Sequence, residues 1–412
     1  MLRKNQSDAI NRSIENDFSS GIHYHATGTG KSWIAMHLLK EYNKKYMNKN
    51  VLWICESKDI LKEQFNKKIL EKRDFNNILK NYNVYNFVEK KNNEWYNCLN
   101  SARYWNKPYL CVINRCYLTT KKKYEYIRNN IDLVIHDECH SIENKSTKEF
   151  YDWLLEHNSD CKVIGFSATP ELIYPLDNII SSYNIYDGYV DNIILAPKIV
   201  WIKCEHEYVE LDMINIIKNE LKHLYYKKII VWCGMIEECV KIGLNWKEYF
   251  DDYKVCIDFC NIDSKKYNMF GNYDDFYNSA GNSILFCAVK HREGSDIPDI
   301  DGCIFLDKVE KRSKRLFIQS MGRVLRKDNL NKKKYGLVID VKAKSTIEIC
   351  NRVQHYLKLE NIFPWKYGCR KYKVNKKICY YVNELIMEKR EESNNEDNDI
   401  KLKLNKDYCK DD

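Results

Sequence analysis

Short apolar runs alternate with longer amphipathic segments along most of the chain. In the first half these runs are brief, bounded by polar residues and rich in β-branched or aromatic side chains, as buried strands are. They lie at 21–25, 51–55, 109–113, 133–135 and 163–166. The segments 33–46 and 59–70 between them predict helices. This alternation predicts an α/β fold in which helices cover both faces of a parallel sheet.

A second series of the same kind follows a stretch that contains Pro175, Gly188 and Pro197. Its apolar runs lie at 229–233, 255–259, 283–287, 302–306 and 336–340. The pattern therefore predicts one architecture used twice, in domains at 1–196 and 197–345. After them we expect a helical and then basic, aromatic extension at 346–387, and a charged tail at 388–412 that is at least partly disordered.

The bulk composition fits this picture. A chain of 412 residues exceeds what one hydrophobic core usually supports. Its net charge of +9 is compatible with a nucleic-acid partner and equally with a well-solvated surface. The polar start at 1–13 argues against a secretory leader, and no apolar run reaches the length of a membrane span. The 17 cysteines are scattered rather than paired, which predicts buried thiols in a reducing, intracellular compartment.

The most informative motif follows the first predicted strand. Two glycines let the backbone curl so that its N–H groups converge on a phosphate, and the next helix adds its positive end. In this motif lysine reaches the β- and γ-phosphates and serine binds Mg²⁺. The strict pattern has glycine where His25 stands. The residues predicted to hold ATP are Ala26, Thr27, Gly28, Thr29, Gly30, Lys31 and Ser32.

A pair of acids ends the apolar run at 133–135. Asp137 and Glu138 would lie at the carboxyl edge of the sheet, where α/β proteins bind ligands. An enzyme with a phosphate-binding loop needs one acid to hold Mg²⁺ and another to polarise the attacking water. Asp137 suits the metal role, together with Ser32, and Glu138 the role of base. Alone the pair would be taken for solvated loop acids, but it follows a phosphate loop.

Five motifs in this order resemble those of superfamily 2 helicases. They are residues 26–32, 137–140 (Asp-Glu-Cys-His), 167–169 (Ser-Ala-Thr), 293–296 (Glu-Gly-Ser-Asp) and 319–326 (Gln-Ser-Met-Gly-Arg-Val-Leu-Arg). More narrowly, the chain resembles the DExH group that includes type III restriction and DNA-repair helicases. The resemblance covers roughly residues 1–345 and implies two tandem RecA-like domains. Similar proteins are common in large DNA viruses, and the Asn-, Lys- and Tyr-rich composition fits such a source, which would place the protein in host cytoplasm or virion.

The resemblance implies roles at the matching positions of the first domain. Gln6 would read adenine, for which an amide is suited, with a helix cap as the alternative. Ser167 and Thr169 would couple the ATP site to the nucleic-acid track. His140 would lie between the acids and that linker, or be an internally satisfied imidazole.

In the second domain the resemblance implies that Gln319, Arg323 and Arg326 complete the ATP site. Their spacing places them on one helical face, and arginine can meet spreading phosphate charge with several donors. The alternative is a basic surface face. Asp296, after Gly294, would accept from the ribose hydroxyls.

Nucleic-acid contacts follow by analogy at Ser57 and Lys58, and at Asn114 and Arg115. Such contacts go to phosphates and do not read sequence; ordinary loop polarity is the alternative. Ala288 stands where the family has a hydroxyl residue. Lys290 and His291 would then supply a substitute phosphate contact or simply face water.

These motifs together predict an ATP-dependent helicase or translocase that uses ATP and Mg²⁺. DNA is the first candidate partner and RNA the second; no membrane partner is expected, and the sequence identifies no protein partner. The motifs do not distinguish this function from that of an ATP-controlled clamp without unwinding activity. A P-loop kinase for a small molecule is a second alternative, although it would not need the helix at 319–326. The basic, aromatic run at 365–377 suits base stacking, but a strand or helix that packs its aromatic side chains on the second domain, with its lysines in water, is the simpler explanation.

Overall fold

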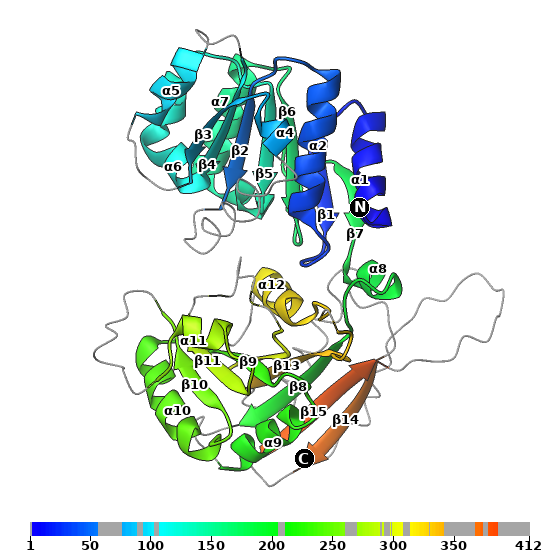
Figure 1. Ribbon diagram of the computed structural model, residues 1–412, viewed down its shortest axis with the longest axis vertical. Coiled ribbons are helices and arrows are strands. Elements are labelled where there is room, and N and C mark those ends of the chain that lie inside the picture. The colour runs from blue at the N-terminus through cyan, green and yellow to red at the C-terminus, as the bar shows by residue number, and fades with distance from the viewer. Residues whose placement is uncertain are drawn as a thin grey trace, which may run out of the picture. The chain divides into compact units, whose positions relative to one another are not determined.

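The computed structural model consists of two compact units, one within Met1–Asn184 and one from Ile185 onward (Figure 1). The described residues are 2–56, 76–88, 94–102, 107–204, 211–259, 270–288, 291, 297, 299–307, 314–328, 330–341, 367–373 and 378–385.

The first unit is built on a seven-stranded sheet in the order β3-β4-β2-β5-β6-β1-β7. Its strands are β1 (Gly21–His25), β2 (Val51–Cys55), β3 (Asn83–Phe87), β4 (Tyr109–Asn114), β5 (Leu133–Asp137), β6 (Lys162–Ser167) and β7 (Ile179–Tyr183). Every neighbouring pair is parallel. The carboxyl ends therefore share one edge, and the loops after β1, β2, β4, β5 and β6 gather there.

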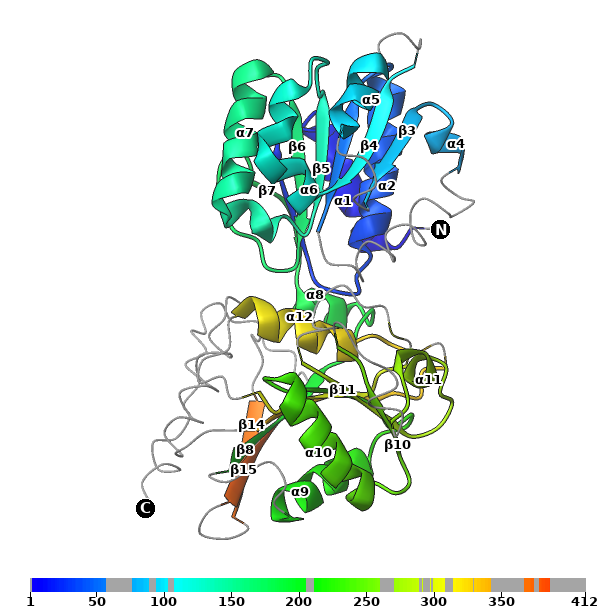
Figure 2. The same cartoon turned by 90° about the vertical axis from the view of Figure 1, so that its left-hand side faces the viewer.

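Helices cover both faces of this sheet (Figure 2). They are α1 (Lys4–Glu15), α2 (Lys31–Lys45), α4 (Asn76–Leu79), α5 (Trp95–Ser101), α6 (Arg115–Thr119), η4 (Thr120–Tyr126), η5 (Cys139–Glu143) and α7 (Lys145–His157). Trp53 of β2 packs in the core shared with α1 and α2. Its neighbours Leu52 and Ile54 belong to the core shared with α5, α6 and α7. Since successive strand residues point to opposite faces, one continuous apolar run serves both cores.

The second unit holds an eight-stranded sheet in the order β10-β11-β9-β12-β13-β8-β15-β14. Its strands are β8 (Pro197–Cys204), β9 (Lys228–Trp232), β10 (Lys254–Ile257), β11 (Ser283–Cys287), β12 (Gly302–Phe305), β13 (Gly336–Val341), β14 (Tyr367–Lys373) and β15 (Ile378–Leu385). The strands from β10 to β8 pair in parallel. β15 runs antiparallel to both β8 and β14. Two strands from the predicted extension are thus part of the second sheet.

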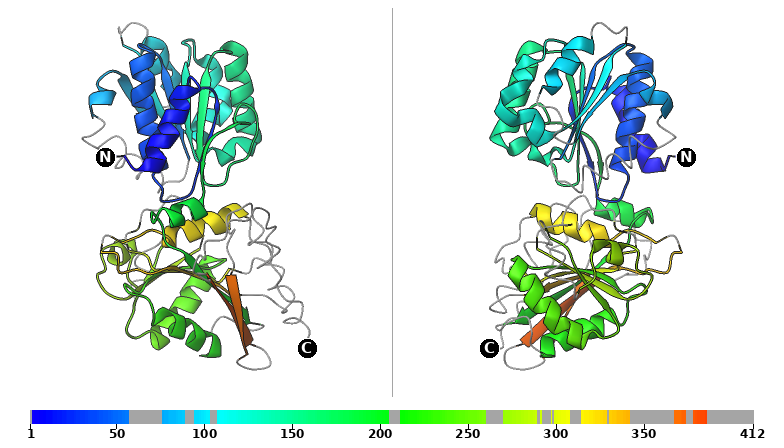
Figure 3. Two further views of the ribbon diagram at one scale, coloured as in Figure 1. Left: turned by 90° about the vertical axis from the view of Figure 1, so that its right-hand side faces the viewer. Right: turned by 60° about the vertical axis from the view of Figure 1, so that its left-hand side comes forward.

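Helices α9 and α12 use opposite faces of that sheet (Figure 3 shows α12 across the sheet from α10). The helices of this unit are α8 (Ile185–Val190), α9 (Leu211–Leu221), α10 (Ile236–Tyr249), α11 (Tyr273–Tyr277) and α12 (Lys314–Val324). Val200 and Ile202 of β8 share a core with α9 and α10. Trp201, which points the other way, stacks on Phe317 of α12 at 6.2 Å between ring centroids. Phe305 of β12 stacks on Phe317 at the same distance. Aromatic side chains therefore seat α12 on the sheet.

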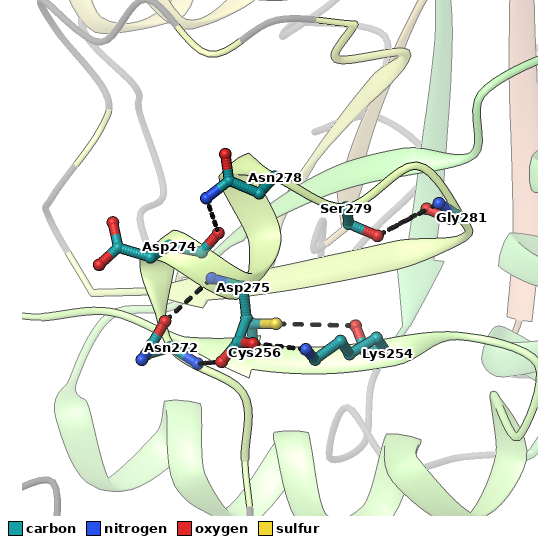
Figure 4. A network of polar contacts seen from close by, with 8 residues as sticks. All are labelled: Lys254, Cys256, Asn272, Asp274, Asp275, Asn278, Ser279 and Gly281. Carbon is teal, nitrogen blue, oxygen red and sulfur yellow. Dashed lines mark hydrogen bonds and ion pairs between the residues drawn. The ribbon is translucent and has the colours of Figure 1, made fainter.

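Helix α11 has a reciprocal cap at its start (Figure 4). The Asn272 side chain accepts from the backbone N–H of Asp275 at 2.9 Å, and Asp275 accepts from the backbone N–H of Asn272 at 2.9 Å. The other Asp275 oxygen lies 2.6 Å from the Lys254 ammonium on β10. The cap thus satisfies two exposed N–H groups and also joins α11 to the sheet.

The fold class predicted from the sequence is confirmed: two parallel sheets, each with helices. Each strand predicted from an apolar run is present, and the helix predicted at 33–46 is α2. The apolar pattern missed β3, β7, β8 and β15, whereas β14 lies in the run at 365–377 for which a strand or helix on the second domain was the simpler explanation. The segments 59–70, 345–359 and 388–412 lie outside the described residues. The domain boundary at 196–197 stays a prediction; the compact units themselves part after Asn184.

Candidate functional site

The loop between β1 and α2 is closed by its own hydrogen bonds. Gly28 and Gly30 have φ of 88° and 99°, in the left-handed region that favours glycine. The Thr29 hydroxyl donates to the carbonyl oxygen of Ala26 at 2.7 Å, and Thr29 is fully buried. Ser32 follows Lys31, which opens α2. The loop, which also includes Thr27, thus wraps the start of a helix, as the phosphate-loop prediction requires.

Gln6 of α1 lies directly against this loop. Its side-chain amide donates to the carbonyl oxygen of Thr29 at 3.3 Å and accepts from the backbone N–H of Arg3 at 3.0 Å. A β-carbon on Gly30 would collide with the Gln6 amide. The helix-cap alternative is therefore part of what Gln6 does, and the same side chain ties α1 to the loop. Its contact with adenine stays a prediction.

The acids at the end of β5 face the loop lysine. Glu138 adopts the left-handed conformation (φ 54°), which turns the chain immediately after Asp137. One Glu138 oxygen lies 3.6 Å from the Lys31 ammonium and the other 3.4 Å from Nδ1 of His140. Lys31 and His140 are buried, whereas Glu138 is 19% exposed. Three predicted site residues, from two loops, thus meet in one cluster.

His136, which the sequence analysis did not single out, supports the acid-bearing turn from behind. Its Nδ1 lies 2.8 Å from the Tyr151 hydroxyl of α7, and its Nε2 lies 3.2 Å from the Ser141 hydroxyl. Burial lowers the pKa of His136 to about 3, so the ring is neutral and uses one nitrogen as donor and the other as acceptor. A histidine within an apolar strand, next to the acids, was the signal available in the sequence.

A second buried network lies behind the phosphate loop. The Ser181 hydroxyl of β7 lies 2.7 Å from Nδ1 of His23 and 2.8 Å from Nε2 of His25. Nε2 of His23 in turn lies 2.9 Å from the Ser13 hydroxyl of α1. Burial lowers the pKa of His25 to about 3 and also depresses that of His23. His25, which stands where the strict motif has glycine, is therefore one end of a neutral hydrogen-bonded chain.

The predicted coupling residues Ser167 and Thr169 lie at the end of β6. This strand is between β5, which carries the acids, and β1, which carries the loop. The backbone N–H of Thr169 donates to the Ser167 hydroxyl at 3.0 Å, and both side chains are buried. Their place between the two motif-bearing strands fits a coupling role, which stays a prediction.

The two residues predicted after β4 have internal partners. The Asn114 amide donates to the carbonyl oxygen of Val88 at 2.8 Å and accepts from the backbone N–H of Tyr117 at 2.7 Å, which caps α6. Asn114 is 1% exposed, so its structural role is the one that ordinary loop polarity predicted. Arg115 lies 3.2 Å from a carboxylate oxygen of Glu56, at the end of β2. Arg115 is partly exposed and stays a candidate for phosphate contact.

In the second unit, Gln319 and Arg323 are buried on α12, at 2% and 8% exposure. Arg326 follows the helix, and burial lowers its pKa to about 10. The surface-face alternative is therefore wrong for Gln319 and Arg323. Their action on ATP stays a prediction.

His291 neither faces water nor is placed for a phosphate contact. It is 3% exposed and its Nε2 lies 2.5 Å from a carboxylate oxygen of Asp258. Its ring stacks on that of Tyr273 at 4.5 Å. Both alternatives for this residue are wrong because the imidazole is used inside the unit. The predicted residues Ser57, Lys58, Lys290, Gly294 and Asp296 lie outside the described residues.

The described cysteines have free thiols. Within the same residues, no group of three or more histidine, cysteine, aspartate or glutamate side chains could hold a metal ion. None of the helices described above is long and apolar enough to cross a membrane.

Residues 1–172 match the family model described as type III restriction enzyme, res subunit. The matched residues lie within the first unit, which is thus similar to this superfamily 2 helicase-like family, and the family implies the use of ATP. The match covers the phosphate loop, the acids and the coupling residues. No curated protein matches the sequence.

The chain is also similar to solved structures. The ATP-dependent type ISP restriction-modification enzyme LlaBIII, bound to DNA, matches with a TM-score of 0.61 and 14% identity, over 87% of this chain and 30% of that chain. Dbp5 of S. cerevisiae, bound to RNA and ADP BeF3, matches with a TM-score of 0.58 and 15% identity, over 88% and 87%. LlaGI, in a nuclease-deletion mutant with a DNA substrate mimic, has a TM-score of 0.57 and 16% identity, over 87% and 28%.

At these identities the likeness shows the fold alone, two units that each hold a sheet of parallel strands with helices. The chain spans less than a third of the length of LlaBIII and of LlaGI. The comparisons give no support to a viral origin.

Proposed function

We propose that this protein is a DExH-type helicase or translocase that hydrolyses ATP to move along or unwind nucleic acid. The observation that carries the proposal is the meeting of Lys31, Glu138 and His140 at the carboxyl edge of the first sheet. The match of residues 1–172 to a superfamily 2 family supports it independently. In this proposal 1–196 is the ATP-binding domain and 197–345 the second helicase domain.

ATP binding would exchange the partner of Lys31. At 3.6 Å from Glu138, and mostly shielded from water, Lys31 already has an anionic partner. A triphosphate in the loop carries more negative charge than the Glu138 carboxylate and would replace it as the ion-pair partner of Lys31. Glu138 would then be free to orient the attacking water, and Ser32 and Asp137 would be the residues that hold Mg²⁺. His140, which stays beside Glu138, would transmit this change of partner to the coupling residues Ser167 and Thr169.

The second unit would supply the remaining cations. Arg323 and Arg326 would meet the charge that spreads over the transferred phosphoryl group, a contribution worth about 10³–10⁵ in rate in related reactions. Gln319 would orient the same groups, and Gly294 and Asp296 would hold the ribose. Ser57, Lys58, Arg115 and Lys290 would contact phosphates of the nucleic acid. We leave Asn114 out because its amide is already used internally.

DNA is the partner we favour, with RNA second. LlaBIII is bound to DNA and Dbp5 to RNA in the structures that this chain resembles. An ATP-controlled clamp without unwinding activity uses the same motifs and stays the alternative. Hydrolysis without strand displacement would favour the clamp, and hydrolysis that ignores nucleic acid would favour a small-molecule kinase.

The test is ATPase activity of the full chain with single-stranded and duplex DNA and RNA in parallel, beside a strand-displacement assay. Glu138→Gln and Arg323→Ala should each abolish turnover, and Lys31→Ala should abolish ATP binding. Lys44→Ala is the matched control, since Lys44 is on the same helix but exposed and paired with Glu41. Full turnover in Glu138→Gln or Arg323→Ala would refute the mechanism.

A further inference from the structure

The last turn of α12 is capped by a buried lysine from further along the chain. The Lys333 ammonium donates to the carbonyl oxygen of Val324 at 2.6 Å and to that of Arg326 at 3.3 Å. It also donates to the carbonyl oxygen of Ile300, which precedes β12. Lys333 is only 6% exposed. A single side chain therefore joins the end of α12 to the segment that leads into β12, a central strand of the second sheet.

The chemistry of this cap depends on charge. The last carbonyls of a helix have no partners within the helix, and they form its negative end. An ammonium has three N–H donors, which match the three carbonyl oxygens around Lys333. A neutral amine has one donor fewer and no charge. Loss of one proton would therefore weaken the cap without moving any other group.

The end of α12 is held from other sides as well. The backbone N–H of Leu195 donates to the carbonyl oxygen of Leu325 at 2.8 Å. A β-carbon on Gly336 would collide with the carbonyl oxygen of Val324, so the start of β13 approaches this turn closely. The Asp328 carboxylate accepts from the backbone N–H of Lys333 at 3.1 Å, which fixes the loop that carries the lysine.

We propose that Lys333 is a positioning residue, which holds the end of α12 so that Arg323 and Arg326 keep the orientation in which they act on ATP. This inference rests on the proposed function. Lys333 reaches the predicted site through main-chain atoms: it donates to the carbonyl oxygens of Val324 and Arg326, and so acts through the backbone of the arginine-bearing turn.

The surroundings of Lys333 make the cap sensitive to alkaline pH. Burial lowers the pKa of Lys333 to about 8, against the raising effect of Asp301, Asp328 and Asp299, and Arg326 lowers it further. In the unfolded chain the group keeps its ordinary value of 10.5. Because the folded pKa is the lower one, neutralising Lys333 between pH 8 and 10.5 does not cost folding free energy. The hydrogen bonds from Lys333 to the carbonyl oxygens at the end of α12 nevertheless weaken over that pH range.

The experiment compares Lys333→Met with Lys332→Met in the full chain. Lys332 is the adjacent residue, but it is exposed and its ammonium donates to the Tyr225 hydroxyl at 2.9 Å. We expect Lys333→Met to lower kcat roughly 10- to 100-fold, as a misplaced catalytic group does, while the KM for ATP changes little. The wild type and Lys332→Met should lose kcat above about pH 8 without losing thermal stability, because deprotonation of Lys333 favours the folded state. Lys333→Met should lack this pH dependence.

Hydrogen exchange of residues 314–328 gives a second readout that needs no ATPase activity. Corrected for the intrinsic pH dependence, protection should fall in Lys333→Met and, in the wild type, between pH 7 and 9. Unchanged protection in both comparisons overturns the inference, as does wild-type kcat in Lys333→Met. Should Lys333→Met fail to fold, the wild-type pH series decides. A wild type without ATPase activity but with this exchange pattern would refute the proposed function and leave the cap established.

Discussion

Removing the Ser181 hydroxyl should destabilise the first unit strongly, although it deletes one atom. The hydroxyl lies within 2.8 Å of a ring nitrogen of both His23 and His25. Both imidazoles are buried, at 0% and 1% exposure. In Ser181→Ala each ring would keep a polar nitrogen in an apolar surrounding without the partner it has now.

The magnitude follows from counting those nitrogens. A buried donor or acceptor left without a partner costs about 1–3 kcal/mol. Two such atoms predict a loss of about 2–6 kcal/mol, a large part of the stability of an ordinary domain. The neighbouring Ser182 is exposed on the same strand, so Ser182→Ala should change the stability by less than about 0.5 kcal/mol.

The chain has two compact units and need not unfold in one transition. The assay is therefore urea-dependent hydrogen exchange of peptides that cover β1 and β7, compared with peptides from β9 and β12 of the second unit. Only the first pair should lose protection in Ser181→Ala. Equal protection in Ser181→Ala and Ser182→Ala would refute the reasoning, because the histidine network would then contribute nothing to the strand that carries the phosphate loop.

Two further predictions concern pH and close packing. The pKa values of His25 and His136 are lowered from 6.5 to about 3 and that of His23 is also depressed, so the unfolded first unit binds protons that the folded one does not. Its free energy of unfolding should therefore fall by up to about 1.4 kcal/mol per pH unit for each ring as the pH drops from about 6.5 toward 3, and the urea midpoint should fall with it. The exposed His157→Gln variant should behave as the wild type does, and a constant midpoint from pH 7 to 5 would contradict the burial of these rings. Gly336→Ala should lower the stability of the second unit by about 1–3 kcal/mol, because its methyl group meets the Val324 carbonyl, whereas Gly281→Ala adds a methyl group to open space. Indistinguishable melting temperatures for the two alanine variants would show that the turn yields.

The sequence located the elements that carry chemistry because those elements are locally encoded. Continuous apolar runs marked the parallel strands, and the glycines of residues 26–32 marked the loop. It missed β7 because the pair Ser181 and Ser182 interrupts the apolar pattern there. It left open whether the run at 365–377 is a strand or a helix on the second domain, and β14 lies there as a strand. It missed β15. Pairing with β8 is a property of the assembled sheet.

Contacts between segments that are distant in the sequence could not be predicted from local patterns. His291 and Asn114 are polar residues next to strand ends, a position that equally suits ligand contact and internal bonding. Their partners, Asp258 and Val88, come from other strands and loops, so no local pattern distinguishes the two uses. The same holds for Lys333, whose role depends on where α12 ends in space.

By itself, the sequence determined the class of fold and the identity of the residues that would handle a triphosphate, because strand periodicity and glycine-dependent turns are local physics. Only the tertiary structure decided which polar side chains hold those residues in place. Burial removes water as a partner, and a buried amide, imidazole or ammonium must then be satisfied by whatever the fold brings beside it.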